Sequence, residues 1–133
     1  MGRDKYIPAL IDEIIGNFPN SRIVEVEKTV HDFVLDAKRL QPLGIILNEL
    51  LTNIMKYAFF GRNNGLISVM AKNADGHATV SVQDDGVGMP ESVSFENSTG
   101  FGFQLAQALT QQLDGTIRIE RVKGTRVVLG FPL

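Results

Sequence analysis

The most instructive stretch of this chain is Asn48-Glu49-Leu50-Leu51-Thr52-Asn53-Ile54-Met55-Lys56-Tyr57. Apolar residues in it and just before it recur at helical spacing, at Leu43, Ile46, Leu47, Leu50 and Ile54. This period predicts a long amphipathic helix with one buried stripe. We expect the helix to begin near Pro42, which suits a first turn, and to end at the run from Gly61 to Gly65.

Three polar side chains share one face of this helix, beside the apolar stripe. With about 100° of rotation per residue counted from Leu43, they fall between about 220° and about 280°, and they are Glu49, Asn53 and Lys56. Tyr57 borders the stripe at about 320°. Asn offers magnesium a hard oxygen without adding charge, and Lys supplies a positive charge for phosphate. A solvated helix face is the alternative interpretation.

A second segment, Asp84-Asp85-Gly86-Val87-Gly88, follows the strand-like alternation of residues 78–82. Asp-Gly after such a strand is common in hairpin turns, yet the run from Val87 to Pro90 does not start a return strand. A carboxylate at a strand end can accept a hydrogen bond from an exocyclic amine. The glycines would let the backbone approach a planar base closely. The segment predicts base recognition, with a plain turn as the alternative.

A third segment, Ser98-Thr99-Gly100-Phe101-Gly102, precedes another helical pattern. It fits a helix cap, and free N–H groups at a helix start also bind anions. No Lys or Arg occurs between Lys72 and Arg118. Neutralisation of phosphate would therefore fall to magnesium, Lys56 and helix N–H groups, with Arg62 as a spare candidate.

Length and composition limit the class of protein. The chain has 133 residues, a net charge of −2 and no cysteine, which predicts one domain and excludes disulfides and thiolate metal sites. The charge favours neither nucleic acid nor a membrane surface as a partner. No apolar run approaches the roughly 20 residues of a membrane span and no signal peptide is visible, so we expect a cytoplasmic domain, with any membrane anchor elsewhere in a parent protein. His31 and His77 lie near no Cys or Ser that would indicate a zinc site or a triad.

The rest of the pattern predicts the other elements. Helical spacing covers residues 7–15, a turn covers 17–21, and short strands are expected at 23–26 and 33–35. Residues 67–71 and 78–82 alternate around a turn at 73–76, as in a hairpin. A helix is expected over 102–113, with Leu105, Leu109 and Leu113 on one face and Gly115 as its stop, followed by strands at 117–119 and 127–131. This order predicts an α+β fold, a two-layer sandwich with helices on one face of a mixed, mostly antiparallel sheet.

Taken together, the three segments resemble the N, G1 and G2 boxes of the ATP-binding domain of sensor histidine kinases, in the superfamily shared with gyrase, Hsp90 and MutL. The likeness covers nearly the whole chain from about Arg22. Residues 43–53 and the ending at 124–133 are most similar to the kinase branch with a short lid. The resemblance implies a Bergerat-type ATP-binding fold over one domain, residues 1–133, with an N-terminal helix and turn over 1–20 and the nucleotide-binding core over 21–133.

The resemblance also implies roles for individual residues. Asn53 would hold magnesium, Glu49 would position the ion or its waters, and Lys56 would face the phosphates, so these three form the catalytic set. Asp84 would read the adenine amino group, with Tyr57 and Thr125 beside the ring. The glycines that complete the two later boxes are Gly86, Gly88, Gly100 and Gly102. Three residues depart from the family pattern and would narrow the pocket, namely Met55, Phe101 and Phe103.

The implied function is to bind Mg-ATP and transfer its γ-phosphoryl group to a histidine. That histidine is expected on a separate dimerisation and phosphoacceptor helical domain of the same parent, with a response regulator downstream, because no helical hairpin carrying it is visible here. Two alternatives stay open: a degenerate adenine-nucleotide-binding module without transfer, suggested by the phenylalanines, and a serine kinase of the anti-sigma type. A gyrase-like ATP-hydrolysing dimer is disfavoured, because we see no exchange arm or transducer segment.

Overall fold

The computed structural model describes residues 6–31, 35–59, 61–87 and 103–133. In this part the α-helices are α1 (Tyr6–Gly16), α2 (Ala37–Asn53) and α3 (Phe103–Gln112). Two short helical segments adjoin them, the 3-10 turn η2 (Pro19–Ile23) and the π-helix η3 (Ile54–Ala58). The strands are β1 (Val24–His31), β2 (Gly65–Ala74), β3 (His77–Asp84), β4 (Thr116–Val122) and β5 (Gly124–Pro132).

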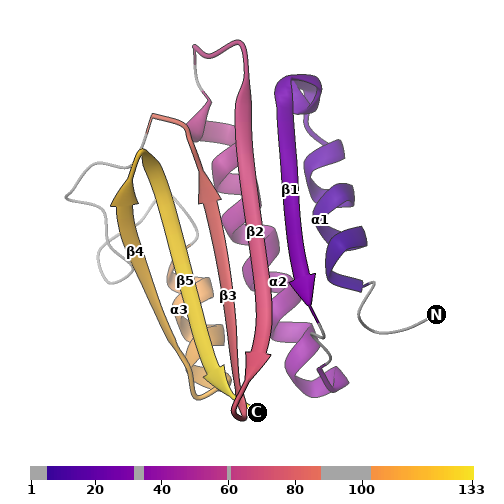
Figure 1. Ribbon diagram of the computed structural model, residues 1–133, viewed down its shortest axis with the longest axis vertical. Coiled ribbons are helices and arrows are strands. Elements are labelled where there is room, and N and C mark those ends of the chain that lie inside the picture. The colour runs from indigo at the N-terminus through magenta and orange to yellow at the C-terminus, as the bar shows by residue number, and fades with distance from the viewer. Residues whose placement is uncertain (1–5, 32–34, 60, 88–102) are drawn as a thin grey trace.

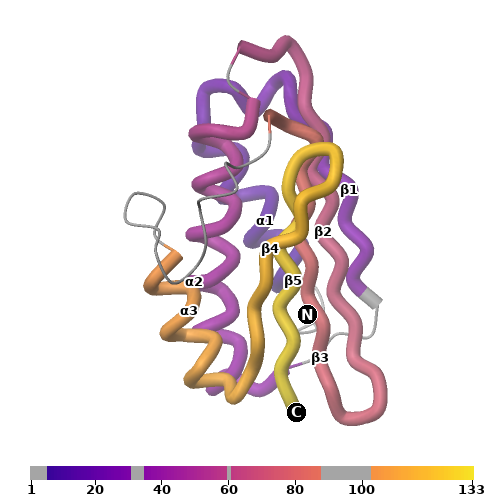
Figure 2. The backbone as a smooth tube through the Cα atoms, turned by 90° about the vertical axis from the view of Figure 1, so that its left-hand side faces the viewer, coloured from indigo at the N-terminus to yellow at the C-terminus, as the bar shows by residue number. Residues whose placement is uncertain are grey.

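The strands form one five-stranded sheet in the order β1-β2-β3-β5-β4, so β3 is the central strand. β1 and β2 are parallel, and the other neighbours pair antiparallel. The helices lie on one side of this sheet (Figures 1 and 2). The predicted α+β class and its two-layer, mostly antiparallel arrangement are confirmed. None of the helices in the described ranges is long and apolar enough to cross a membrane.

Helix α2 begins at Ala37, earlier than the predicted start at Pro42. Asp36 caps it, because the Asp36 carboxylate accepts the backbone N–H of Arg39 at 3.3 Å. Pro42 therefore lies inside the helix, where its missing N–H forfeits one helical hydrogen bond. The predicted apolar stripe is confirmed, since all of its members are buried, namely Leu43, Ile46, Leu47, Leu50 and Ile54.

Of the two strands expected between α1 and α2, the first corresponds to β1, and the second, at 33–35, lies mostly outside the described residues. β1 runs without a break from Val24 to His31 and pairs with β2 along its length. Leu35 is buried but belongs to no strand, and Phe33 lies outside the described residues. Leu35 directly precedes the Asp36 cap, where an apolar residue often packs against the first turns of a helix. Its side chain is therefore buried beside the start of α2.

The leucine face predicted for helix α3 is buried only in part, since Leu113 is buried and Leu109 packs against the core. Leu105 is 46% exposed, whereas the buried residues of the helix are Phe103, Ala106 and Thr110. Phe103 is the largest of them and is fully buried, so its burial and not that of Leu105 sets the orientation of the helix. The Thr110 hydroxyl donates to the Ala106 oxygen at 2.7 Å, which allows a polar residue to face the core.

Two turns at the ends of the strands place residues in the left-handed region. The β2–β3 hairpin turns at Asp75 and Gly76, with φ of 55° and 73°, within the predicted turn. After α3 the left-handed residue is Asp114, with φ of 58°, and not the predicted stop Gly115. Gly115 serves close packing instead, because a Cβ there would lie 2.4 Å from the Gly130 oxygen.

Candidate functional site

Asp84 is the last residue of the central strand β3, at the same end of the sheet as the start of β5 (Figure 1). Its side chain is only 3% exposed, which is rare for a carboxylate. In the sheet register it stands opposite Thr125, a second buried polar residue. One carboxylate oxygen accepts the Gly86 N–H at 2.8 Å. A buried acid is thus held at a strand end.

The surroundings of Asp84 alter its ionisation. Burial raises its pKa above the ordinary value, because the carboxylate loses hydration, and the neighbouring Asp85 charge acts in the same direction. Hydrogen bonds from the backbone at Gly86 and Thr125, and the more distant Arg62 charge, oppose this shift without cancelling it. An acid in such an environment is suited to a ligand that brings hydrogen-bond donors to it.

Asp85, although adjacent, has a different role. Its Oδ1 accepts the Leu66 N–H at 2.9 Å, which fastens the end of β3 to the start of β2. The Arg62 guanidinium donates to the Asp85 carbonyl oxygen at 3.0 Å and lies 3.9 Å from its carboxylate. Arg62, which we considered as a spare phosphate ligand, is therefore paired within the protein. Of the two acids, only Asp84 is the buried one.

The C-terminal end of α2 is π-helical, and this changes the directions predicted for its polar face. Hydrogen bonds in a π-helix join residues five apart, so each residue turns through less than the about 100° of an α-helix. Within η3, Lys56 is exposed and Tyr57 is 46% exposed. A half-exposed ring fits the position predicted for Tyr57, on the border between the buried stripe and the polar face, although the turn is π-helical.

The end of β3 docks against the end of η3. The Val87 N–H donates to the Ala58 oxygen at 2.8 Å. A Cβ on Gly86 would lie 2.2 Å from that same oxygen, so only glycine allows this approach. Asn53, which is 8% exposed, lies one π-turn before Ala58. The structure thus brings Asn53 and Asp84 to the same end of the molecule, on adjoining segments.

Thr125 joins this group through a glycine that we did not predict to matter. Gly124 has a φ of 104°, and a Cβ on it would lie 2.1 Å from the backbone carbonyl oxygen of Asp84. Only glycine can therefore bring the start of β5 so close to the end of β3. The Gly124-Thr125 pair is visible in the sequence, but a single glycine before a strand does not distinguish this approach from an ordinary turn.

The remaining predicted residues are placed as follows. Glu49 is partly buried and stands one turn before Asn53 on α2. Gly88, Gly100 and Gly102, as well as Phe101, lie outside the described residues. Met55 and Phe103 are buried in the hydrophobic core, so both side chains pack there. Across the described ranges no cluster of three or more His, Asp or Glu side chains is arranged to hold a metal ion.

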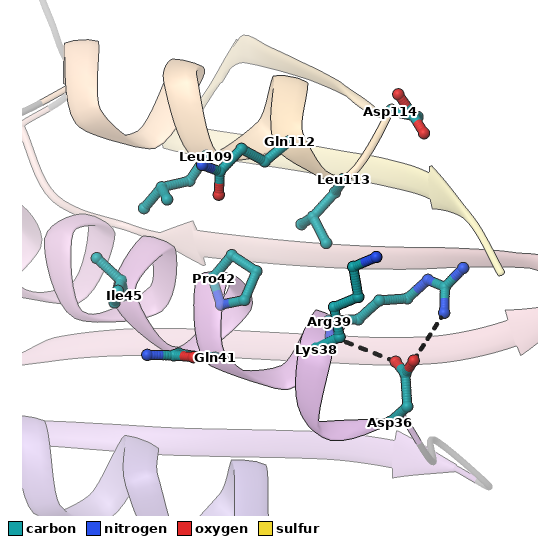
Figure 3. A pocket seen from close by; sticks show the side chains of 10 residues that line it. All are labelled: Asp36, Lys38, Arg39, Gln41, Pro42, Ile45, Leu109, Gln112, Leu113 and Asp114. Atoms are coloured by element: carbon teal, nitrogen blue, oxygen red, sulfur yellow. Dashed lines mark hydrogen bonds and ion pairs between the residues drawn. The ribbon is translucent and has the colours of Figure 1, made fainter.

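A cleft of about 770 Å³ lies elsewhere, between the first turns of α2 and the last turn of α3 (Figure 3). Its walls include Pro42, Ile45 and Leu109, with the Asp36–Arg39 ion pair at one side. It lies at the opposite end of α2 from Asn53, so it does not belong to the group around Asp84.

Comparisons with known proteins agree with the resemblance. A family model for histidine kinase-, DNA gyrase B-, and HSP90-like ATPases matches residues 39–133. The sensor histidine kinase PdtaS of Mycolicibacterium smegmatis is 31% identical over 134 residues, which cover 98% of this chain and 26% of PdtaS. The chain thus spans about a quarter of that relative.

Solved structures show the same fold. The Erythrobacter litoralis EL346 blue-light activated histidine kinase is similar with a TM-score of 0.85 and 26% identity, over 100% of this chain and 42% of that one. The catalytic domain of histidine kinase ThkA has a TM-score of 0.74 at 22% identity, over 95% of this chain and 91% of that chain, and this likeness concerns the fold alone. The chain belongs to the histidine kinase-, DNA gyrase B- and HSP90-like ATPase family, as an ATP-binding catalytic domain of the sensor histidine kinase type.

Proposed function

We propose that this domain binds Mg-ATP between the end of β3 and the α2–η3 helix and transfers the γ-phosphoryl group to a histidine on a separate helical domain. The observation that carries this proposal is the buried Asp84 carboxylate at the end of the central strand, docked through Gly86 and Val87 against η3. Family membership supports the use of ATP.

Asp84 would select the base. Adenine presents an amino group where guanine presents a carbonyl oxygen. A buried carboxylate accepts from the amino group but repels the carbonyl oxygen, and water cannot screen this repulsion well at a site that is 3% exposed. Thr125 stands beside Asp84 in the sheet register and would contact the same edge of the base. The half-exposed ring of Tyr57 offers a flat surface for the adenine face.

Asn53 and Glu49 would hold magnesium. An amide oxygen and a carboxylate oxygen are hard ligands of the kind that Mg²⁺ takes, and the two residues stand one turn apart on the same side of α2. One protein amide with one acid suits an ion that keeps several waters and binds substrate phosphates. When bound, the ion would neutralise phosphate charge. The exposed ammonium of Lys56 would add to that neutralisation and orient the phosphates.

The transfer step needs little covalent chemistry from this domain. An imidazole nitrogen of the acceptor forms a bond to the γ-phosphorus as the bond from phosphorus to the bridging oxygen of ADP breaks. ADP leaves with the electron pair, and the other imidazole nitrogen releases its proton to solvent. The contribution of the domain is to position ATP and to stabilise charge. Glu49 would then orient the magnesium shell and would not activate water, because the nucleophile is a side chain.

Relatives support histidine as the acceptor, since the similar proteins are named as histidine kinases. This chain matches 26% of PdtaS and 27% of the blue-light-activated relative, so the acceptor helices and a response regulator partner belong to the proposal. Burial of Phe103 in the core weakens one reason for a degenerate module, because that ring packs inside the domain.

Calorimetric titration with ATP, ADP and GTP, each with and without magnesium, tests the binding part. We expect adenine nucleotides to bind, GTP to bind more weakly, and magnesium to strengthen binding. Transfer is tested by supplying a histidine-bearing helical hairpin from a similar kinase in trans. Acid-labile phosphate on the hairpin would support histidine transfer. Acid-stable phosphate would indicate a serine acceptor, and binding without transfer to any supplied hairpin would favour the nucleotide sensor.

A further inference from the structure

Asn20 lies outside all three sequence segments, in the short turn η2 between α1 and β1. Its side-chain amide donates a hydrogen bond to the Met55 backbone oxygen at 3.1 Å, across 35 positions of the sequence. Met55 belongs to η3, the π-helix that also carries Lys56 and Tyr57. The family match begins at residue 39, so a turn outside that match contacts the helix end beside the candidate site.

Three segments supply donors to the end of η3. The last carbonyls of a helix have no donor within the helix, so they are satisfied from outside. The Asn20 amide serves the Met55 oxygen. The Val87 N–H serves the Ala58 oxygen at 2.8 Å, and the Arg62 N–H serves the Phe59 oxygen at 3.0 Å. One of these donors comes from the N-terminal turn, and another comes from the segment that follows Asp84.

The hydrogen bond from Asn20 to the Met55 oxygen affects whether η3 is α-helical or π-helical. In an α-helix the Met55 oxygen would accept from the N–H four residues later, at Phe59, whereas a π-helix joins residues five apart. A side-chain amide on the Met55 oxygen competes with the α-helical donor. The two forms rotate the following side chains by different amounts, so the choice between them sets the directions of Lys56 and Tyr57.

We propose that Asn20 is a positioning residue of this domain: its amide holds η3 in the π-helical form and so directs Lys56 and Tyr57 towards the candidate site. The geometric part of this inference stands without any ligand, and its consequence for nucleotide affinity rests on the proposed function. Because η2 joins α1 to β1, a displacement of that N-terminal unit would reach the site through this hydrogen bond.

Asn20→Ala in the full chain tests the inference, with Asn17→Ala as the matched control. Asn17 is an exposed asparagine three residues earlier, at the end of α1. The chain has two tyrosines and no tryptophan, so a Tyr6→Phe background leaves Tyr57 as the one tyrosine fluorophore. Three quantities are measured: acrylamide quenching of Tyr57, amide hydrogen exchange, and calorimetric affinity for Mg-ADP.

We expect Asn20→Ala to change Tyr57 quenching and to speed exchange of the Ala58 and Phe59 amides by about twofold to tenfold, the effect of losing one hydrogen bond. Amides in the centre of β2 and β3 should keep their exchange rates. Affinity for Mg-ADP should fall by a similar factor. Asn17→Ala should match the unmodified chain in all three measurements.

Unchanged quenching and exchange in η3 would overturn the inference, as would faster exchange spread equally over β2 and β3, which indicates lost stability alone. A local change in η3 with unaltered affinity would refute the link to the site. If the unmodified chain binds no nucleotide, the proposed function fails, and quenching and exchange still decide the role of Asn20. Should Asn20→Ala not fold, Asn20→Asp keeps the size of the side chain while replacing the donor by an acceptor, and the same outcomes apply.

Discussion

Replacing Asp84 by asparagine is the sharpest test of the candidate site, because it changes one atom of a buried group. One carboxylate oxygen already accepts the Gly86 N–H at 2.8 Å, and the asparagine oxygen can continue to do so. The other oxygen becomes an NH2 group. A donor then faces the adenine amino group, which is itself a donor, so a charge-assisted hydrogen bond is lost.

The expected loss follows from the burial of this position. At 3% exposure, water cannot replace the missing partner, and the cost of losing the bond is about 1–3 kcal/mol. That cost weakens binding of Mg-ADP by about fivefold to 150-fold. Calorimetry measures this change directly, and ADP avoids any turnover during the titration.

Asp84→Asn should affect the stability of the folded domain differently from its affinity for Mg-ADP. Burial raises the pKa of Asp84, which means that the folded state disfavours its charged form. An amide carries no such penalty, and this gain offsets the weakened hydrogen bond from the Thr125 backbone, so the thermal midpoint of the nucleotide-free Asp84→Asn protein should change little. A general disruption of the fold would lower both quantities, and the two measurements together separate recognition from folding.

Asp85→Asn provides the matched control. Asp85 is the adjacent acid, but it is half-exposed, and its carboxylate accepts the Leu66 N–H and pairs with Arg62. Such pairs contribute about 0–1 kcal/mol. We expect a small change in stability and less than about a twofold change in affinity for this variant. The reasoning fails if Asp84→Asn, while folded, binds Mg-ADP as the unmodified chain does, or if Asp85→Asn weakens binding as much.

Three further predictions follow from the same geometry. Affinity for Mg-ADP should fall as the pH is lowered, because Asp84 must be ionised to bind adenine. Since burial raises the pKa of Asp84, this fall should begin at a higher pH than it would with an ordinary aspartate. Titrations across pH should show the fall, and Asp84→Asn should abolish it. The stability contribution of this group has the opposite sign: it rises as pH falls through the raised folded-state pKa towards the ordinary value of about 3.9, since the folded state binds the proton more tightly. Magnesium should increase the affinity for ADP, and Asn53→Asp should change the size of this increase by more than about fivefold. The affinity for adenosine, which has no phosphate, should stay within about twofold. Equal effects on both ligands would count against a metal role. Gly86→Ala should cost about 1–3 kcal/mol of stability, because its Cβ would meet the Ala58 oxygen at 2.2 Å. Gly16→Ala is the control, since its Cβ would have nothing within 4 Å, and it should raise stability by up to about 1 kcal/mol. Chemical denaturation measures both changes.

The parts of the fold that the sequence predicted correctly depend on local periodicity. The buried stripe of α2 repeats over several turns, so it was recognisable even though Pro42 misplaced the start of the helix. The β2–β3 hairpin was recognisable because alternating strands flank Asp75-Gly76. The burial of α3 was not, because several apolar side chains compete for the core, and packing favoured Phe103 over Leu105.

The site shows the same division. The sequence identified the acid at the end of β3 and the polar face of α2, because both lie in short motifs. It could not identify the π-helix, since that form depends on donors from distant segments, among them Asn20 and Val87. A helical wheel drawn at a constant angle therefore does not describe the turn that carries Lys56 and Tyr57. The choice of site residues stays a prediction.

The glycines beside Asp84 show why a motif can be recognised for an incomplete reason. We attributed Gly86 to close approach by a flat base, yet the space where its Cβ would lie is filled by the Ala58 backbone, with the oxygen at 2.2 Å. At Gly124, likewise, a Cβ would lie 2.1 Å from the backbone carbonyl oxygen of Asp84. Both glycines are required before any ligand arrives, because they let a strand end, a helix end and a second strand meet around one carboxylate. The position of Asp84 is therefore a consequence of backbone packing, so a substitution that separates these segments should weaken nucleotide binding even when every side chain assigned to the ligand is intact.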